Sequence, residues 1–164
     1  MASPGVRRAL LPLAGALTLA TSAACGSNPV LSWECDLVEP AGDFADCNPL
    51  NGPPATYPAT VELTVRASEP GDEPGAETGA FIETLEASID DASDPVCAVG
   101  AVDCAGGVLC TVAVTIAGDG TCGVRLDAET SLGRARDCEI VGWDPAAVTD
   151  VDALIERTDA LCFD

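Results

Sequence analysis

The chain contains no histidine and no lysine among its 164 residues. The absence of histidine excludes Ser-His-Asp and Cys-His catalysis, most zinc hydrolase sites and the commonest proton shuttle. Gly106-Gly107 and Gly118-Asp119-Gly120 lack the lysine and the following helix of a phosphate-binding loop. Of the common catalytic mechanisms, this leaves those that use carboxylates, such as the mechanism of glycosidases.

Aromatic residues are also scarce, at 4% of the chain against 48% apolar residues overall. The core must be built mainly from Val, Leu, Ile and Ala, which leaves few rings for stacking on sugars. We expect Trp33 and Trp143 in the core or over a disulfide rather than at a ligand. We therefore predict a protein that is not an enzyme, with no catalytic residues and no cofactor.

Among the charged residues, Asp and Glu dominate, and the formal net charge is −20. The first acidic residue of the chain is Glu34. Such a surface repels phosphate backbones and anionic lipids, which argues against nucleic-acid binding and against membrane binding through a basic patch. The acidic run of Glu69, Asp72, Glu73 and Glu77 is interpreted as a solvated loop, with a calcium site as the alternative.

The first residues have the features of an export signal. Arg7 and Arg8 form a short basic region, and an apolar run follows at 9–20. This run is shorter than the ~20 residues that a membrane-spanning helix needs, and it has the length of a signal-peptide core. Residues 1–24 are predicted to be a signal peptide.

Ala23, Ala24 and Cys25 resemble the lipobox of bacterial lipoproteins, in which a cysteine after small residues is lipidated and the chain is cut in front of it. The family usually has Leu at the position of Ser22. The resemblance covers the signal only. It implies lipid on Cys25 as a membrane anchor in the cell envelope and, with Gly26 after the cysteine, location at the outer membrane or cell surface. The alternative is cleavage after Ala24 as an ordinary small-residue site, which would leave a secreted soluble protein.

The nine cysteines are an odd number, which is unusual for an exported protein unless one has another role. Lipidation of Cys25 leaves an even number, as a disulfide framework requires. A zinc site is disfavoured because the chain has no C-x-x-C pair and no histidine, so we expect no metal. The cysteines expected to form disulfides are Cys35, Cys47, Cys97, Cys104, Cys110, Cys122, Cys138 and Cys162.

Residues 108–117 and 121–127 alternate in polarity around a Gly-Asp-Gly turn, a pattern typical of a β-hairpin. Their apolar faces match if Ile116 opposes Cys122. In that register Cys110 lies roughly 20 Å along the strand from Cys122. A disulfide needs Cα atoms within about 7 Å, so these two cysteines are not expected to pair with each other.

Asp144 and Pro145 are typical of a helix start, and apolar residues recur at helical spacing after them, which predicts a helix over 145–162. A helix that folds back on the extended segment 138–142 brings Cys162 beside Cys138. The short separation of Cys35 and Cys47 favours a local bridge. The remaining four cysteines then pair either as Cys97–Cys110 with Cys104–Cys122 or as Cys97–Cys122 with Cys104–Cys110, and proximity in the sequence favours the second.

Residues 25–57 are rich in Pro, Asn and Gly and are predicted to be a lipid-anchored tether with a Cys35/Cys47 loop. The folded domain is expected over 58–164. Alternation at 61–67 predicts a half-buried strand, and 79–90 fits a strand or a helix. The expected fold class is mainly β: a small disulfide-stapled antiparallel sheet or sandwich of about four or five strands with one C-terminal helix. The alternative is an α+β fold with a second helix near 79–90.

Together these features favour a non-catalytic envelope lipoprotein, a structural or protein-interaction module of unknown specificity. Its expected partners are the membrane, through lipid on Cys25, and an envelope protein. The alternative function is a small carboxylate-dependent hydrolase or a calcium-dependent binding module that uses clustered carboxylates.

Overall fold

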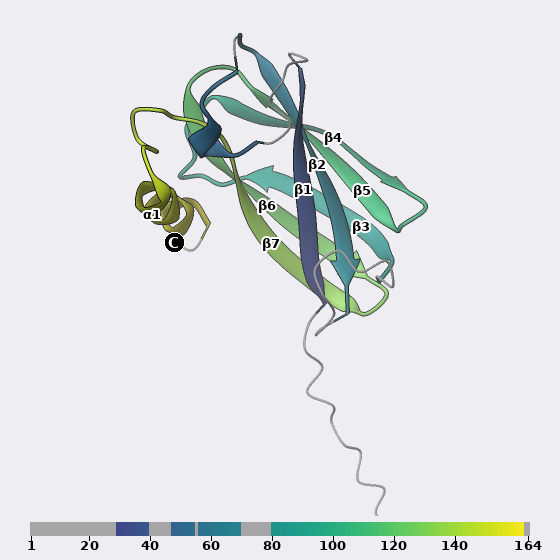
Figure 1. Cartoon of the computed structure of the whole chain (residues 1–164). Helices are drawn as coiled ribbons and strands as arrows, with labels where there is room; N and C mark the ends of the chain where they lie inside the picture. Colours follow the sequence, from purple (N-terminus) through teal and green to yellow (C-terminus); the bar gives the residue numbers. More distant parts are fainter. Residues whose placement is uncertain (1–28, 40–46, 55, 70–79, 163–164) are drawn as a thin grey trace, which may run out of the picture.

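The structure is a computed structural model that describes residues 29–39, 47–54, 56–69 and 80–162. In this part of the chain, two antiparallel sheets face each other and one α-helix lies beside them (Figure 1). The first sheet has the order β1-β2-β5-β4, with β1 Val30–Glu39, β2 Ala59–Ser68, β4 Cys97–Ala105 and β5 Leu109–Ile116. The second has the order β3-β6-β7, with β3 Ile82–Ile89, β6 Gly120–Thr130 and β7 Gly133–Trp143. A short 3-10 helix, η1 Pro49–Asn51, and α1 Val151–Cys162 complete the fold.

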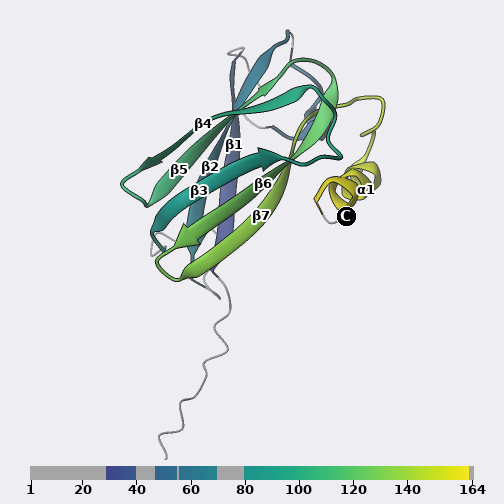
Figure 2. The ribbon, with the colours of Figure 1, turned by 180° about the vertical axis from the view of Figure 1, so that it is seen from behind.

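The strand order is that of seven-stranded immunoglobulin-type sandwiches, in which the first, second, fifth and fourth strands face the third, sixth and seventh. Figure 2, seen from behind, shows the second sheet in front of the first. Antibody domains of this type join their second and sixth strands by a disulfide. Here β2 contains no cysteine, so covalent links between the sheets must lie elsewhere.

Alternation along the strands builds the core between the sheets. Val61, Leu63 and Val65 of β2 are fully buried, and the polar residues between them are half-buried. The facing sheet contributes Leu126 and Trp143, which are also buried. As the composition predicts, small aliphatic side chains make up most of this core, and Trp143 is its largest fully buried side chain.

Helix α1 packs on the outer side of β6 and β7. Its start is capped by Asp150, whose side chain accepts a hydrogen bond from the backbone N–H of Ala153 at 2.9 Å. Leu161 is fully buried and forms a second, smaller apolar cluster with Ile140 of β7. Gly123 of β6 allows the close approach, because a Cβ at this position would lie 2.9 Å from the carbonyl oxygen of Leu161.

The hairpin predicted from residues 108–127 is wrong. β5 pairs with β2 and β4 in the first sheet, whereas β6 pairs with β3 and β7 in the second. The turn after Ile116 crosses between the sheets instead of folding the chain back beside itself. Ile116 and Cys122 are nevertheless both buried in the core. Two facing sheets bring apolar side chains together, just as the two strands of a hairpin would.

The predicted boundaries also need correction. Residues 30–39, assigned to a tether, form β1, because Leu31 and Trp33 alternate inward and pair with β2. The C-terminal helix starts at Val151 rather than at residue 145. Asp144 does cap a turn, since it accepts the N–H of Ala147 at 3.1 Å, but the chain then begins the helix anew at Asp150.

The fold class is confirmed as mainly β, a disulfide-stapled antiparallel sandwich with a C-terminal helix. The described part has more strands than predicted, and the ambiguous segment 79–90 contains a strand, β3, rather than a helix. Among the described residues, no helix is both long and apolar enough to cross a membrane.

Candidate functional site

The cysteines after Cys25 form four disulfides: Cys35–Cys47, Cys97–Cys122, Cys104–Cys110 and Cys138–Cys162. These are the same pairs that the sequence analysis favoured. Cys25 lies outside the described residues. Disulfides in this number indicate a domain that resides outside the cytoplasm, in an oxidising compartment.

Two of these bridges hold separate layers together. Cys97 at the start of β4 reaches across the sandwich to Cys122 on β6. Cys138 on β7 is bonded to Cys162, the last residue of α1, and so fixes the end of the helix on the second sheet. The helix therefore forms a fixed wall beside β7.

A pocket of about 310 Å³ opens where β1, β7, η1 and α1 meet. It is mostly apolar, and one of its walls includes the Cys35–Cys47 disulfide. The other lining residues are Trp33, Asn48, Pro49, Glu139, Ile140 and Leu154. An apolar pocket with a few polar groups is the usual form of a ligand site, so this is the candidate binding site of the described fold.

Glu139 is the charged residue of this pocket, and its position follows from the strand register. Its Cα partner on β6 is the core residue Val124, and the partner of Asp137 is the core residue Leu126. Both carboxyl groups therefore lie on the inward face of β7, at the edge of the sandwich. Edge strands commonly carry such inward-pointing charges, which discourage pairing with another chain.

Burial raises the pKa of the Glu139 carboxyl from its ordinary value of 4.5 to about 8. The nearby Asp137 carboxyl also raises this pKa, and the backbone N–H of Ile140 opposes the shift. Burial raises the pKa of Asp137 as well. At neutral pH the Glu139 side chain is thus largely protonated, and it can donate a hydrogen bond to a group that enters the pocket.

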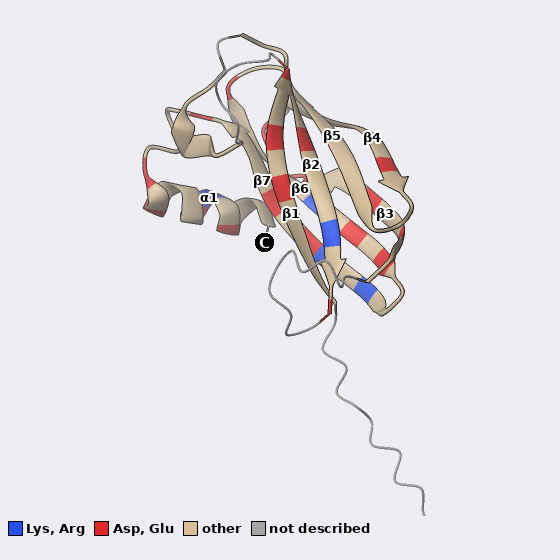
Figure 3. Ribbon diagram, turned by 45° about the vertical axis from the view of Figure 1, so that its right-hand side comes forward, with Lys and Arg blue, Asp and Glu red and all other residues tan. Residues whose placement is uncertain are grey.

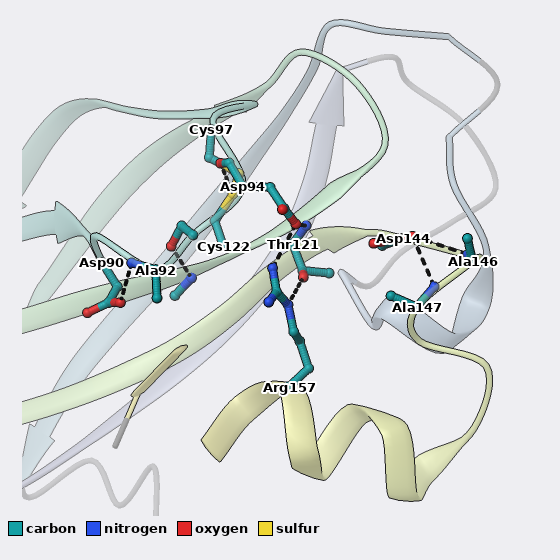
Figure 4. Close-up of polar contacts among 12 residues, drawn as sticks. Asp90, Ala92, Asp94, Cys97, Thr121, Cys122, Asp144, Ala146, Ala147 and Arg157 are labelled. Atoms are coloured by element: carbon teal, nitrogen blue, oxygen red, sulfur yellow. Dashed lines mark hydrogen bonds and ion pairs between the residues drawn. A yellow bond between two sulfur atoms is a disulfide. The ribbon is translucent and has the colours of Figure 1, made fainter. Parts of the chain in front are cut away.

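Arg157 positions the helical wall of the pocket (Figure 4). Its Nε donates to the hydroxyl oxygen of Thr121 at 2.8 Å, and its Nη2 lies 2.8 Å from Oδ2 of Asp94. The same Asp94 oxygen accepts the backbone N–H of Thr121 at 2.9 Å. The arginine thus links α1 to β6 and to the loop before β4, and Leu154 of that helix is held at the pocket.

The outer face of the second sheet carries a cluster of ion pairs. Arg125 lies 2.5 Å from Asp90, and Asp127 is paired with both Arg134 and Arg136. Arg134 also lies 3.8 Å from Glu129, so three arginines, each substantially exposed, face three carboxylates and the cluster is balanced in charge. We interpret it as part of the surface of the fold and not as an anion site.

Within the described ranges, no three of the metal-binding residue types gather in one place. Glu69 is exposed at the end of β2, and the acidic residues Asp72, Glu73 and Glu77 lie outside the described residues. No family model, curated protein or solved structure matches the chain.

Sequence reasoning missed Glu139 and the pocket role of Trp33. Trp33 is half-buried beside the Cys35–Cys47 bridge, close to its predicted place over a disulfide, but it also lines the pocket. The signal for Glu139 was present, because an alternating inward face runs from Ala135 to Trp143 and includes it. To identify Glu139 from this pattern, one would also have to know that β7 is an edge strand of its sheet.

Proposed function

We propose that the protein is a non-catalytic lipoprotein of the cell envelope, a structural or protein-interaction module held by lipid on Cys25. The observation that carries the proposal is the cysteine pairing. Of nine cysteines, eight are used in four disulfides, so Cys25 has no cysteine of its own chain left to pair with. Lipidation gives this remaining thiol a role, at the position where the lipobox resemblance puts it.

The pocket supplies the module with a point of contact. Its walls are two strand edges, a disulfide and a helix fixed at its end by a second disulfide, so it is formed before any partner arrives. An apolar side chain of a partner protein fits such a lining, and Glu139 can donate to a polar atom beside it. The net negative charge favours a partner of opposite charge around this contact.

Intact mass spectrometry of the mature protein tests the anchor. The expected mass is that of a chain that begins at Cys25 and carries a diacylglyceryl group. On reduction this mass should rise by two hydrogens for each of the four disulfides. The matched control is the precursor with Cys25→Ala, which should carry no lipid and leave the membrane fraction. A mature protein with an unmodified Cys25, or one that begins after it, would overturn the proposal.

A small carboxylate-dependent hydrolase remains the second candidate, because Asp137 and Glu139 are neighbouring inward carboxyls with raised pKa values. A calcium-dependent module would instead be revealed by thermal unfolding with calcium and with EDTA. The proposal predicts no shift in Tm between the two conditions. A rise of several degrees with calcium, or a hydrolytic activity that Glu139→Gln removes, would favour the alternatives.

A further inference from the structure

One end of the sandwich exposes four large apolar side chains, which we call the apolar rim: Val30, Phe81, Val108 and Leu132. Their exposed fractions are 49%, 56%, 53% and 48%. They come from four different segments: the start of β1, the residue before β3, the β4–β5 turn and the β6–β7 turn. Single exposed apolar residues are ordinary, but several gathered at one end of a domain mark an interaction surface.

Hydrogen bonds and strand register place these segments at the same end. The N–H of Phe81 donates to the hydroxyl oxygen of Ser131, next to Leu132, at 3.1 Å. The N–H of Ile82 donates to the carbonyl oxygen of Gly107, next to Val108, at 2.6 Å. Val30 pairs with Ser68 at the end of β2 that is nearest the β4–β5 turn.

The chain also enters the fold at this end. β1 starts at Val30, five residues after Cys25, and five residues of extended chain span at most about 18 Å. A lipid on Cys25 therefore keeps Val30, the rim residue on β1, within that distance of the bilayer. Helix α1 lies toward the opposite end of the sandwich (Figure 1).

Resting on the proposed lipid anchor, we infer that the apolar rim docks on the bilayer that holds Cys25, with Phe81, Val108 and Leu132 inserted at the headgroup level. The anchor makes the contact intramolecular, so that even a weak insertion is populated at the high effective concentration of a short tether. No basic patch is needed, which agrees with the acidic composition.

The overall charge of the chain selects the kind of lipid. Figure 3 shows acidic residues on strands of both sheets, and the formal net charge of the chain is −20. The rim should therefore prefer zwitterionic over anionic membranes.

Amide hydrogen exchange tests this docking on the lipidated mature protein, placed in vesicles of phosphatidylethanolamine and phosphatidylcholine. The reference is mature chain with Cys25→Ser, made without residues 1–24 and mixed with the same vesicles. We expect exchange on the order of tenfold slower at residues 80–82, 106–109 and 131–133 of the anchored protein. Exchange in α1 should be unchanged.

Two sets of substitutions make the test specific. The triple variant Phe81→Ser, Val108→Ser, Leu132→Ser should lose the slowing while staying anchored. The matched control Val151→Ser, Ile155→Ser removes two apolar side chains of similar exposure, 59% and 54%, from α1. This control should keep the slower exchange at the rim.

The possible failures are distinguishable. Lipid on Cys25 with equal exchange at the rim in anchored and free protein would overturn the docking and leave the anchor intact. A mature protein without lipid would overturn the proposed function and the docking together. Slowing that appears without vesicles as protein concentration rises would assign the rim to a second copy of the chain, which also overturns the inference.

Discussion

Cys97, the first residue of β4, is bonded to Cys122 on β6, with their Cα atoms 6.4 Å apart. Cys97 is also the strand partner of Ile116, the last residue of β5. The disulfide therefore lies where the chain crosses from the first sheet to the second, and it joins the two sheets covalently beside that crossing.

This placement predicts unequal effects of removing two disulfides. The Cys97–Cys122 bridge closes a separation of 25 residues and the Cys104–Cys110 bridge one of 6. On loop-closure entropy, replacing Cys97 and Cys122 by Ala should cost about 3.5 kcal/mol of unfolding free energy, and replacing Cys104 and Cys110 by Ala about 2 kcal/mol. Equilibrium unfolding in urea measures both.

Each double variant serves as the control for the other, because each lacks two cysteines and keeps three disulfides. A larger loss from the Cys104/Cys110 pair would contradict the prediction. It would mean that the link within the first sheet contributes more to stability than the link between the sheets.

Arg157→Ala should loosen α1. It removes the donor to the buried Thr121 hydroxyl and the partner of Asp94, and an unpaired buried hydroxyl costs about 1–2 kcal/mol. Arg157→Lys should restore only part of the loss, since an ammonium group lacks the planar fork that reaches both acceptors. Faster amide exchange in α1 is the measurement. Asp159→Ala, an exposed change on the same helix, should leave this exchange rate unchanged.

The raised pKa of Glu139 predicts a stability that depends on pH. Because its pKa in the fold, about 8, lies above the ordinary 4.5, the folded state holds this proton more tightly than the unfolded chain does. This contribution is fully present below pH 4.5 and is lost as pH rises through 8. Asp137, whose pKa is raised too, acts in the same direction.

Glu139→Gln should therefore flatten the pH dependence. At pH 9 the variant is expected to be more stable than the wild type by roughly 1–3 kcal/mol, because the amide avoids a buried negative charge. Urea unfolding at pH 5, 7 and 9 measures the difference, with Glu156→Gln on the exposed side of α1 as the control for loss of a carboxylate. Parallel curves for wild type and Glu139→Gln would contradict the assignment.

Gly123→Ala should displace α1 from β6. The new methyl group would lie 2.9 Å from the carbonyl oxygen of Leu161 and 3.1 Å from its Cβ, so the helix must move. We expect a loss of roughly 1–3 kcal/mol, as for other overpacked sites. Thermal unfolding gives the comparison with Gly118→Ala, where the added methyl group meets no atom within 4 Å. Equal Tm values for the two variants would contradict the close packing.

The sequence predicted which side of each strand is buried better than it predicted which strands pair. Alternation correctly placed Val61 and Leu63, and also Ile116 and Cys122, toward the interior. The same alternation is compatible with a hairpin and with a crossing to the facing sheet, because both arrangements bring apolar faces together. Cys110 and Cys122 are indeed not bonded to each other, but the expected hairpin register is not the reason. Cys110 is bonded to its strand partner Cys104, and Cys122 is bonded to Cys97 across the sandwich.

Composition misled at the N-terminal side of the domain. Pro, Asn and Gly around residues 40–52 suggested a tether, while the alternation of Leu31, Trp33 and Cys35 in front of them was a strand. The pocket could not be predicted because it requires four segments to meet, and Glu139 and Leu154 become neighbours only through the packing of α1.

The pairing of β1 with β2 also determines how the domain would carry a mechanical load. The proposed lipid anchor on Cys25 would pull on β1 at Val30, and the antiparallel bonds to β2 run perpendicular to the strand along its length. A partner held at the pocket, which Trp33 and Cys35 in the middle of β1 help to line, would pull against such a tether roughly along this strand. The force would then shear the β1–β2 hydrogen bonds between Val30 and Cys35 together, and the Cys35–Cys47 bridge would stop β1 from being drawn out past its middle. With the proposed anchor, this architecture would keep the domain folded while it links a membrane to a moving partner protein.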